Sequence, residues 1–187
     1  MNTYDFVHLA LWSLGGEIRG KTKLQKTVYF LGRLMRRLDD LGYSAHYYGP
    51  YSSEVADAVD RLLSLGFLTQ TVSGGGVQDS HGFGVARYDF ALSEEGKRVA
   101  ETKAKSDEDF SVALSGAVEM LKCAGDLDYV RLSIAAKTDF MLAQKGGAAN
   151  VTELAELAKT FGWHVEPNEI SDAARLLETL RLAKAIN

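Results

Sequence analysis

Cysteine and proline are nearly absent from this sequence, and it contains no long apolar run. The one cysteine, Cys123, has no partner for a disulfide, which is typical of a reducing compartment. Only Pro50 and Pro167 can interrupt helices, so the composition favours a mostly helical fold. No stretch of about 18 apolar residues occurs, and the acidic Asp5 stands where a signal peptide is basic and then apolar. We therefore expect a cytoplasmic protein with no membrane partner.

Residue patterns that carry catalysis or bind metals are also missing. The four histidines lie far apart along the chain, and none has the spacing of a metal ligand. The glycine-rich segment 73–84 lacks a lysine before a serine or threonine, so it does not match a phosphate-binding loop. Asp79, Ser80 and His81 are consecutive and cannot reach the geometry of a catalytic triad. The sequence predicts no catalytic residue, no metal site and no cofactor, and therefore a protein that is not an enzyme.

Charge is unevenly distributed along the chain. The net charge of −4 excludes a polycation that would coat nucleic acid. The segment 19–37 nevertheless contains basic residues and no acidic one. Its basic residues are Arg19, Lys21, Lys23, Lys26, Arg33, Arg36 and Arg37. Any affinity for nucleic acid should therefore come from this segment.

Hydrophobic periodicity predicts three helices in the first 65 residues. The first covers 3–14 and ends at two glycines. The second covers 22–42, with Thr22 and Gln25 as a capping box and Gly42 as its stop. The third begins at a serine cap, Ser52 or Ser53, and ends at residue 65. The last two are joined by a turn, as in a helix-turn-helix.

Two strands and five more helices complete the predicted fold. Residues 67–72 and 84–92 alternate as strands and form a hairpin, after which Ser93 caps another helix. Residues 1–105 are therefore predicted to form a winged helix-turn-helix. Residues 106–187 are predicted to add four helices, one capped by Asn150 and Glu153, as a helical C-terminal extension. The fold is thus mostly α with one β-hairpin, and the extension serves dimerisation or is a second helix-turn-helix.

The second predicted helix has an apolar arc and a basic arc. Its basic arc, with the tyrosines of "HYYGPYSSE", forms the predicted nucleic-acid surface: Lys23, Lys26, Arg33, Arg36, Arg37, Tyr47 and Tyr48. The other interpretation is a solvated helix face whose arginines pair with carboxylates elsewhere. Tyr29 and Phe30 lie on the basic arc, but a central helix covered on two sides would bury them. Both interpretations stay open from the sequence.

The tyrosine-rich segment has two interpretations as well. Gly49 and Pro50 predict a tight turn ahead of the third helix. Tyr51 is placed to pack onto that helix, whereas Tyr47 and Tyr48 are candidates for contact with a partner.

These segments carry a resemblance to known proteins. "GKTKLQKTVYFL", "YYGPYSSEVADAVDRLLSLGFL" and "FALSEEGKRVA" resemble the YwgA-like proteins of bacteria and archaea. The combination of Leu24-Gln25-Lys26 with Tyr48-Gly49-Pro50 is also distantly similar to the Panacea antitoxin domain. The YwgA-like resemblance implies no enzymatic activity, and the Panacea resemblance implies neutralisation of a toxin by protein contact.

Two functions follow. The first is a regulatory or defence-associated protein that binds nucleic acid through the basic arc, because the third helix presents a negative face that disfavours ordinary docking in DNA. The second is an antitoxin-like or adaptor module that binds a protein through Glu54, Asp57 and Trp163 without binding nucleic acid. Either protein is expected to form a homodimer through the small and apolar segment "VALSGAVEMLKCA".

Overall fold

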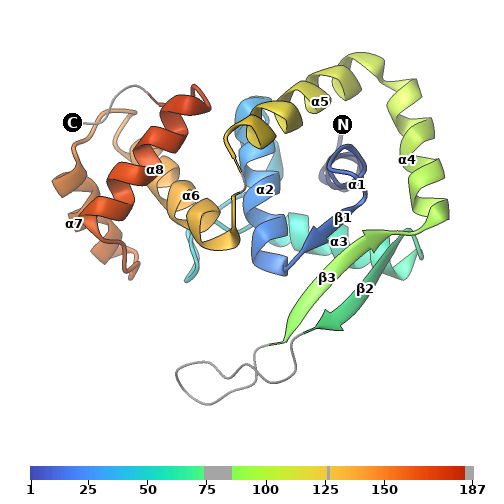
Figure 1. The fold of residues 1–187 in the computed structure, drawn as a ribbon, viewed down its shortest axis with the longest axis horizontal. Helices are drawn as coiled ribbons and strands as arrows, with labels where there is room; N and C mark the ends of the chain where they lie inside the picture. Colours follow the sequence, from blue (N-terminus) through green and yellow to red (C-terminus); the bar gives the residue numbers. More distant parts are fainter. Residues whose placement is uncertain (74–85, 126, 184–187) are drawn as a thin grey trace.

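The computed structural model describes residues 1–73, 86–125 and 127–183 of the 187-residue chain. Within these residues the chain is mostly helical and contains a small antiparallel sheet (Figure 1). The elements are, in order, α1 (Thr3–Ser13), β1 (Glu17–Arg19), α2 (Lys21–Leu34), the 3-10 helix η1 (Leu38–Leu41), α3 (Ser53–Ser64), β2 (Leu68–Ser73), β3 (Arg87–Leu92), α4 (Glu94–Ser106), α5 (Glu108–Cys123), α6 (Tyr129–Gln144), α7 (Val151–Thr160) and α8 (Pro167–Thr179). None of the described helices is both long and apolar enough to cross a membrane.

Three predicted helix caps are confirmed. The Ser52 hydroxyl accepts a hydrogen bond from the backbone N–H of Val55 at the start of α3. The Ser93 hydroxyl accepts one from the backbone N–H of Gly96 at the start of α4. Asn150 and Glu153 form the reciprocal capping box that begins α7. Each cap satisfies backbone N–H groups that a helix leaves without a partner in its first turn.

The boundaries predicted for the second helix are wrong at both ends. α2 begins at Lys21 with Gly20 as its N-cap and has no side-chain cap, so the expected capping box of Thr22 and Gln25 does not form. Gln25 instead bonds to a distant backbone segment. α2 ends at Leu34 rather than at residue 42, because Arg36 takes a left-handed φ of 56° and a separate 3-10 turn follows.

The sheet contains a strand that the sequence pattern does not reveal. This strand is β1, and the strand order of the sheet is β1-β3-β2. Ile18 of β1 lies opposite Phe90, and Leu68 of β2 lies opposite Leu92. These four side chains are buried, so one face of the sheet covers the core. β1 has only three residues, which is too short for an alternation to show. The predicted hairpin is present, but most of its glycine-rich tip, including His81, lies outside the described residues.

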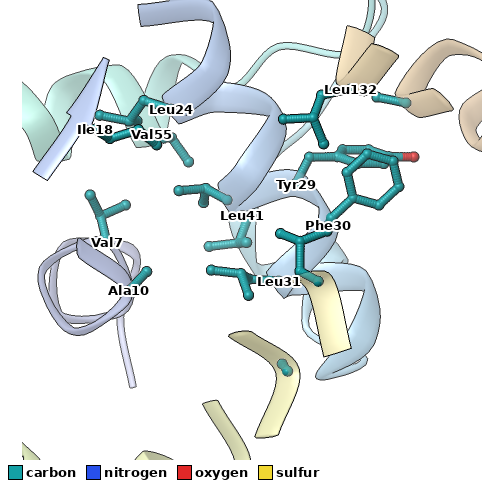
Figure 2. Close-up of a cluster of buried hydrophobic side chains, with 14 of the residues drawn as sticks. Val7, Ala10, Ile18, Leu24, Tyr29, Phe30, Leu31, Leu41, Val55 and Leu132 are labelled. Carbon is teal, nitrogen blue, oxygen red and sulfur yellow. The ribbon is translucent and has the colours of Figure 1, made fainter. Parts of the chain in front are cut away.

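Helix α2 is enclosed on two sides. Figure 1 shows it standing between α1 and the sheet on one side and α6 on the other. All its residues from Leu24 to Gly32 are buried. In Figure 2, Leu24 lies beside Ile18, whereas Tyr29 points to the side where Leu132 of α6 lies. Tyr29 and Phe30 are therefore core residues, as one of the two interpretations expected.

The C-terminal helices continue the same hydrophobic core. α6 contacts α2, α7 and α8, and Figure 1 shows α8 on the side of α6 that is opposite to α2. α5 contacts α1, α2 and α4. The predicted boundary between residues 105 and 106 falls at the junction of α4 and α5. The division into domains at this junction stays a prediction, as does a second helix-turn-helix in the C-terminal part.

Candidate interaction site

The tyrosine turn, defined here as residues 46–51, is a closed backbone loop between η1 and α3. Ser44 and Tyr51 exchange two backbone hydrogen bonds of 3.0 and 2.9 Å, and the Gly49 N–H donates to the His46 carbonyl at 2.9 Å. Gly49 has a φ of +97°, and an added Cβ would come within 2.9 Å of the Cγ atom of Lys137. The turn therefore requires glycine here for its conformation and for the close approach of α6.

Two consecutive residues of α2 bind the backbone of the turn and of the residue that follows it. The Gln25 side chain donates to the Ser52 carbonyl at 2.9 Å and accepts from the Ser52 N–H at 3.2 Å. The Lys26 ammonium donates to the Pro50 carbonyl at 2.5 Å. The two motifs that carry the family resemblance are therefore in direct contact. Their co-occurrence has a structural reason, because the side chains of one bind the backbone of the other.

A second layer of hydrogen bonds fixes the start of α3. The Ser52 hydroxyl donates to the Leu41 carbonyl at 2.5 Å while it accepts from the N–H of Val55. The Tyr43 hydroxyl donates to the Gln25 carbonyl at 2.6 Å. Ser52 and Gln25 are buried, so these bonds are shielded from competition with water. They connect α2, η1 and α3 into one frame for the turn.

The C-terminal half supports the turn from its other side. The Trp163 indole N–H donates to the His46 carbonyl at 2.7 Å, and the Trp163 side chain is buried. The Lys137 ammonium lies 5.8 Å from the centre of the Trp163 ring, within reach of a cation–π contact. Trp163 is one of the residues predicted to bind a partner, but its side chain is buried beneath the turn and cannot contact a partner directly. It supports the backbone from which the tyrosines project.

Tyr47 and Tyr48 project outward from this frame. Their side chains are 70% and 66% exposed, and their rings meet edge to face with centroids 4.9 Å apart. Tyr51 is only partly exposed and lies beside His46, with ring centroids 5.1 Å apart. The accessibility predicted for Tyr47 and Tyr48 agrees with these positions. The packing of Tyr51 onto the third helix stays a prediction, because its ring lies beside His46.

The rest of the predicted basic arc is largely engaged within the protein. Arg33 forms a bidentate ion pair with Asp139 of α6 through bonds of 2.6 and 2.9 Å. Asp139 is buried, and its carboxylate also accepts a 2.6 Å bond from the Tyr29 hydroxyl. Burial, followed by the Asp139 charge, raises the pKa of Tyr29 far above its usual range. The hydrogen bond to Asp139 raises the pKa of Arg33, so the cation is held in its charged form.

The remaining predicted cations differ in their accessibility. Lys26 is only 2% exposed, so the expectation that it lies on an exposed basic face is wrong. Arg37 pairs with Asp40 at 2.6 Å and also donates to the carbonyl of Met1. Lys23 is half-buried and Arg36 is exposed. The five cations therefore do not share one accessible surface: Lys23, Lys26 and Arg33 lie on the enclosed helix α2, whereas Arg36 and Arg37 follow its end.

The two acidic residues predicted as partner contacts lie on α3. Asp57 is exposed, and Glu54 is exposed while accepting a 3.3 Å bond from the Thr3 hydroxyl. Among the described residues, no three histidine, cysteine, aspartate or glutamate side chains are grouped so that they could hold a metal ion.

Burial beneath the turn changes the acidity of two lysines. Loss of hydration, with a smaller repulsion from Lys137, lowers the pKa of Lys26 to about 8. Burial also lowers the pKa of Lys137, and the nearby Glu169 opposes that shift. The two lysines beneath the turn are therefore less basic than ordinary lysines. The pattern of basic residues in the sequence did not predict these lowered pKa values.

Comparison with known proteins relates the chain to one bacterial protein. It is 34% identical over 88 residues to the "Uncharacterized protein YwgA" of Bacillus subtilis (strain 168). The match covers 47% of this chain and 48% of that protein, so the chain spans about half the length of the curated relative it matches. No protein-family model matches the chain. These findings support a relationship to YwgA-like proteins.

The first prediction concerns the Arg33–Asp139 pair. Arg33→Met should lower the free energy of unfolding by about 3–5 kcal/mol, because it leaves a carboxylate buried without its cation. Asp139→Asn should cost less, since the amide still accepts from Tyr29 and the 30% exposed Arg33 side chain can turn to water. Urea denaturation measures both.

The exposed pair of Arg98 and Glu95 offers a control, and Arg98→Met should cost less than about 1 kcal/mol. Equal losses for Arg33→Met and Arg98→Met would contradict the prediction.

The second prediction concerns the pH dependence that Lys26 creates. Its pKa of about 8 in the folded protein is below the ordinary 10.5, so the unfolded chain binds more protons between these values. Stability should therefore rise with pH in this window. From pH 8 to pH 9.5, the unfolding free energy of the natural protein should gain about 2 kcal/mol relative to Lys26→Met. Urea denaturation across this range measures the gain. The exposed Lys21, changed to Met, should give no comparable gain, and a constant difference for Lys26→Met would refute the assignment.

Proposed function

We propose that this protein is a non-enzymatic regulatory module that acts by binding another protein through Tyr47 and Tyr48. The observation that carries the proposal is the contrast between these two exposed rings and the inward-facing cations of α2. The function is antitoxin-like or adaptor-like, as the resemblance to the Panacea domain implies. The relationship to YwgA-like proteins supports a prokaryotic setting but names no activity.

The positions of the basic residues support binding to a protein over binding to nucleic acid. A protein that neutralises phosphates needs several accessible cations on one surface. Lys26 and Arg33 instead bind the Pro50 carbonyl and the buried Asp139. Of the five cations predicted for such a surface, Arg36 is exposed, whereas Lys23, Lys26, Arg33 and Arg37 are buried or partly buried. Binding a phosphate with Arg33 would compete with its ion pair to Asp139, which joins α2 to α6.

The tyrosine turn has the properties of a protein-binding anchor. Tyrosine is enriched among the few residues that contribute most of the energy of protein interfaces, because it adds a large contact area with little rotamer entropy. Here the backbone beneath the two rings is held by Gln25, Lys26 and Trp163. A partner would therefore meet a preorganised turn and would not need to order it on binding.

The order of elements supports a winged helix for the first part of the chain. α1, β1, α2, α3, β2 and β3 follow one another, and the two long strands pair as a hairpin after α3. In this arrangement α3 occupies the place of the helix that enters a DNA groove. Its exposed residues include Glu54, Asp57 and Asp60, so its surface favours a basic partner protein over a polyanion.

The proposal includes a homodimer formed through α5. Val112, Gly116, Met120 and Cys123 are exposed and recur every three or four residues, so they lie along one side of the helix. A Cβ added at Gly116 would meet no atom within 4 Å. A second copy of α5 can therefore approach this side closely.

The third prediction tests the tyrosine turn. Affinity capture from the native host, followed by calorimetry with the purified partner, should show that the double variant Tyr47→Ala/Tyr48→Ala loses about 30-fold in affinity. Tyr129→Ala is the matched control, because Tyr129 is 59% exposed on α6, and it should leave the affinity unchanged.

A parallel titration distinguishes the other function. Fluorescence anisotropy with duplex DNA, single-stranded DNA and RNA across a salt series should show no binding tighter than about 100 µM at physiological salt. Micromolar binding that weakens steeply with salt and is lost in Arg36→Glu would overturn the proposal in favour of nucleic acid. Capture of the same partner by the double tyrosine variant with unchanged affinity would also overturn it.

The fourth prediction tests the dimer. Light scattering over a concentration series should give twice the monomer mass for the natural protein and the monomer mass for Val112→Glu, since a buried carboxylate is costly. Val130→Glu is the control, because Val130 is also an exposed valine, on α6. A monomer mass for the natural protein at every concentration would refute the dimer.

A further inference from the structure

A cavity of about 370 Å³ lies where β1, α2, α5 and the start of α6 meet. It is separate from the tyrosine turn and shares no residue with it. Its volume falls within the usual range for small-molecule sites. Six of its twelve described lining residues have apolar side chains, and five of these are buried: Ile18, Val118, Leu121, Leu127 and Leu132.

Charged groups at the cavity are mostly of one sign. Among the residues that the structure describes, the charged side chains that line it are Arg19, Lys23, Lys122 and one carboxylate, Glu17. Lys122 is paired with Glu119 at 3.1 Å, outside the cavity lining. Arg19 stands opposite Asp89 in the sheet, so its charge is partly balanced by that carboxylate, which Arg87 also binds. Within the described part of the chain, Lys23 has no ion-pair partner. The cavity therefore has an excess of positive charge beside an apolar wall.

Thr27 adds an unused hydrogen-bonding group to the same lining. It is 4% exposed, and its hydroxyl forms no hydrogen bond with any described residue. Lys23 and Thr27 are four residues apart on α2, so their side chains lie on the same face of the helix. The Thr27 hydroxyl is not among the side-chain oxygens that are sealed from solvent without a partner, so it can donate to a ligand in the cavity.

We propose that this cavity binds a small amphipathic carboxylate. The apolar body of the ligand lies against Leu121 and Leu132, and its carboxylate accepts hydrogen bonds from Arg19, Lys23 and the Thr27 hydroxyl. Arg19 favours a carboxylate as the head group of the ligand, because a guanidinium can donate two parallel hydrogen bonds to a planar carboxylate. The inference does not depend on the proposed protein contact, because the two surfaces have no residue in common.

Calorimetry with octanoate tests the site in the full-length protein. Octanoate should bind with a Kd below about 1 mM, whereas acetate, which lacks the apolar body, and 1-octanol, which lacks the charge, should bind at least 10-fold more weakly. The double variant Arg19→Gln/Lys23→Gln should weaken octanoate at least 10-fold. Thr27→Val should weaken it several-fold without lowering the melting temperature, because valine has nearly the same shape and needs no hydrogen bond.

The control is Lys145→Gln, an exposed lysine that does not line the cavity, and it should bind octanoate as the natural protein does. If the double variant fails to fold, Lys23→Gln alone keeps the test decisive, because Lys23 is only half-buried. Absence of octanoate binding at 10 mM would overturn the proposal. So would octanoate binding that Lys23→Gln leaves unchanged, or equal binding of octanoate and 1-octanol.

Discussion

The buried carboxylate of Asp139 determines how the two halves of this protein meet. An unpaired carboxylate in the interior would be costly, so α6 can pack on α2 only where a cation and a hydroxyl receive it. Arg33 and Tyr29 supply both from adjacent turns of α2. The geometry of this pair fixes the register between the helices more narrowly than apolar packing would, because the bidentate ion pair tolerates little displacement.

The same enclosure explains why Lys26 and Arg33 of α2 face inward. A helix that is packed on two sides has little surface left for solvated lysines and arginines. Lys26 therefore lies beneath the tyrosine turn, where it binds the Pro50 carbonyl, and Gln25 beside it binds both backbone groups of Ser52. Polar residues that could have formed a charged surface instead position a backbone loop. What the loop presents outward is aromatic, which favours contact with a protein.

Helix α2 also separates the two candidate binding regions. Its residues Gln25 and Lys26 contact the tyrosine turn, whereas Lys23 and Thr27 line the cavity beside β1 and α5. Residues that follow one another on a helix face different directions, since each is rotated by about 100° from the last. One short segment can therefore contribute to the tyrosine turn and to a pocket that is open to solvent. A ligand in the pocket would contact the helix that supports the turn.

The sequence by itself determined the local structure: the caps at Ser52, Ser93 and Asn150 depend on hydrogen bonds between residues three apart. The hairpin strands were identified by their residue types, although their pairing joins residues as far apart as Leu68 and Leu92. The sequence also identified Tyr47 and Tyr48 as the accessible tyrosines, because a turn leaves such side chains at the surface. Tertiary structure decided the rest. Strand β1 exists because β3 lies beside it, and α2 lost its predicted cap because Gln25 binds Ser52. Arg33 turns inward because it meets Asp139, which is 106 residues away in the sequence, and Lys26 because it binds Pro50, which is 24 residues away. A periodicity confined to one helix carries no information about what packs against it.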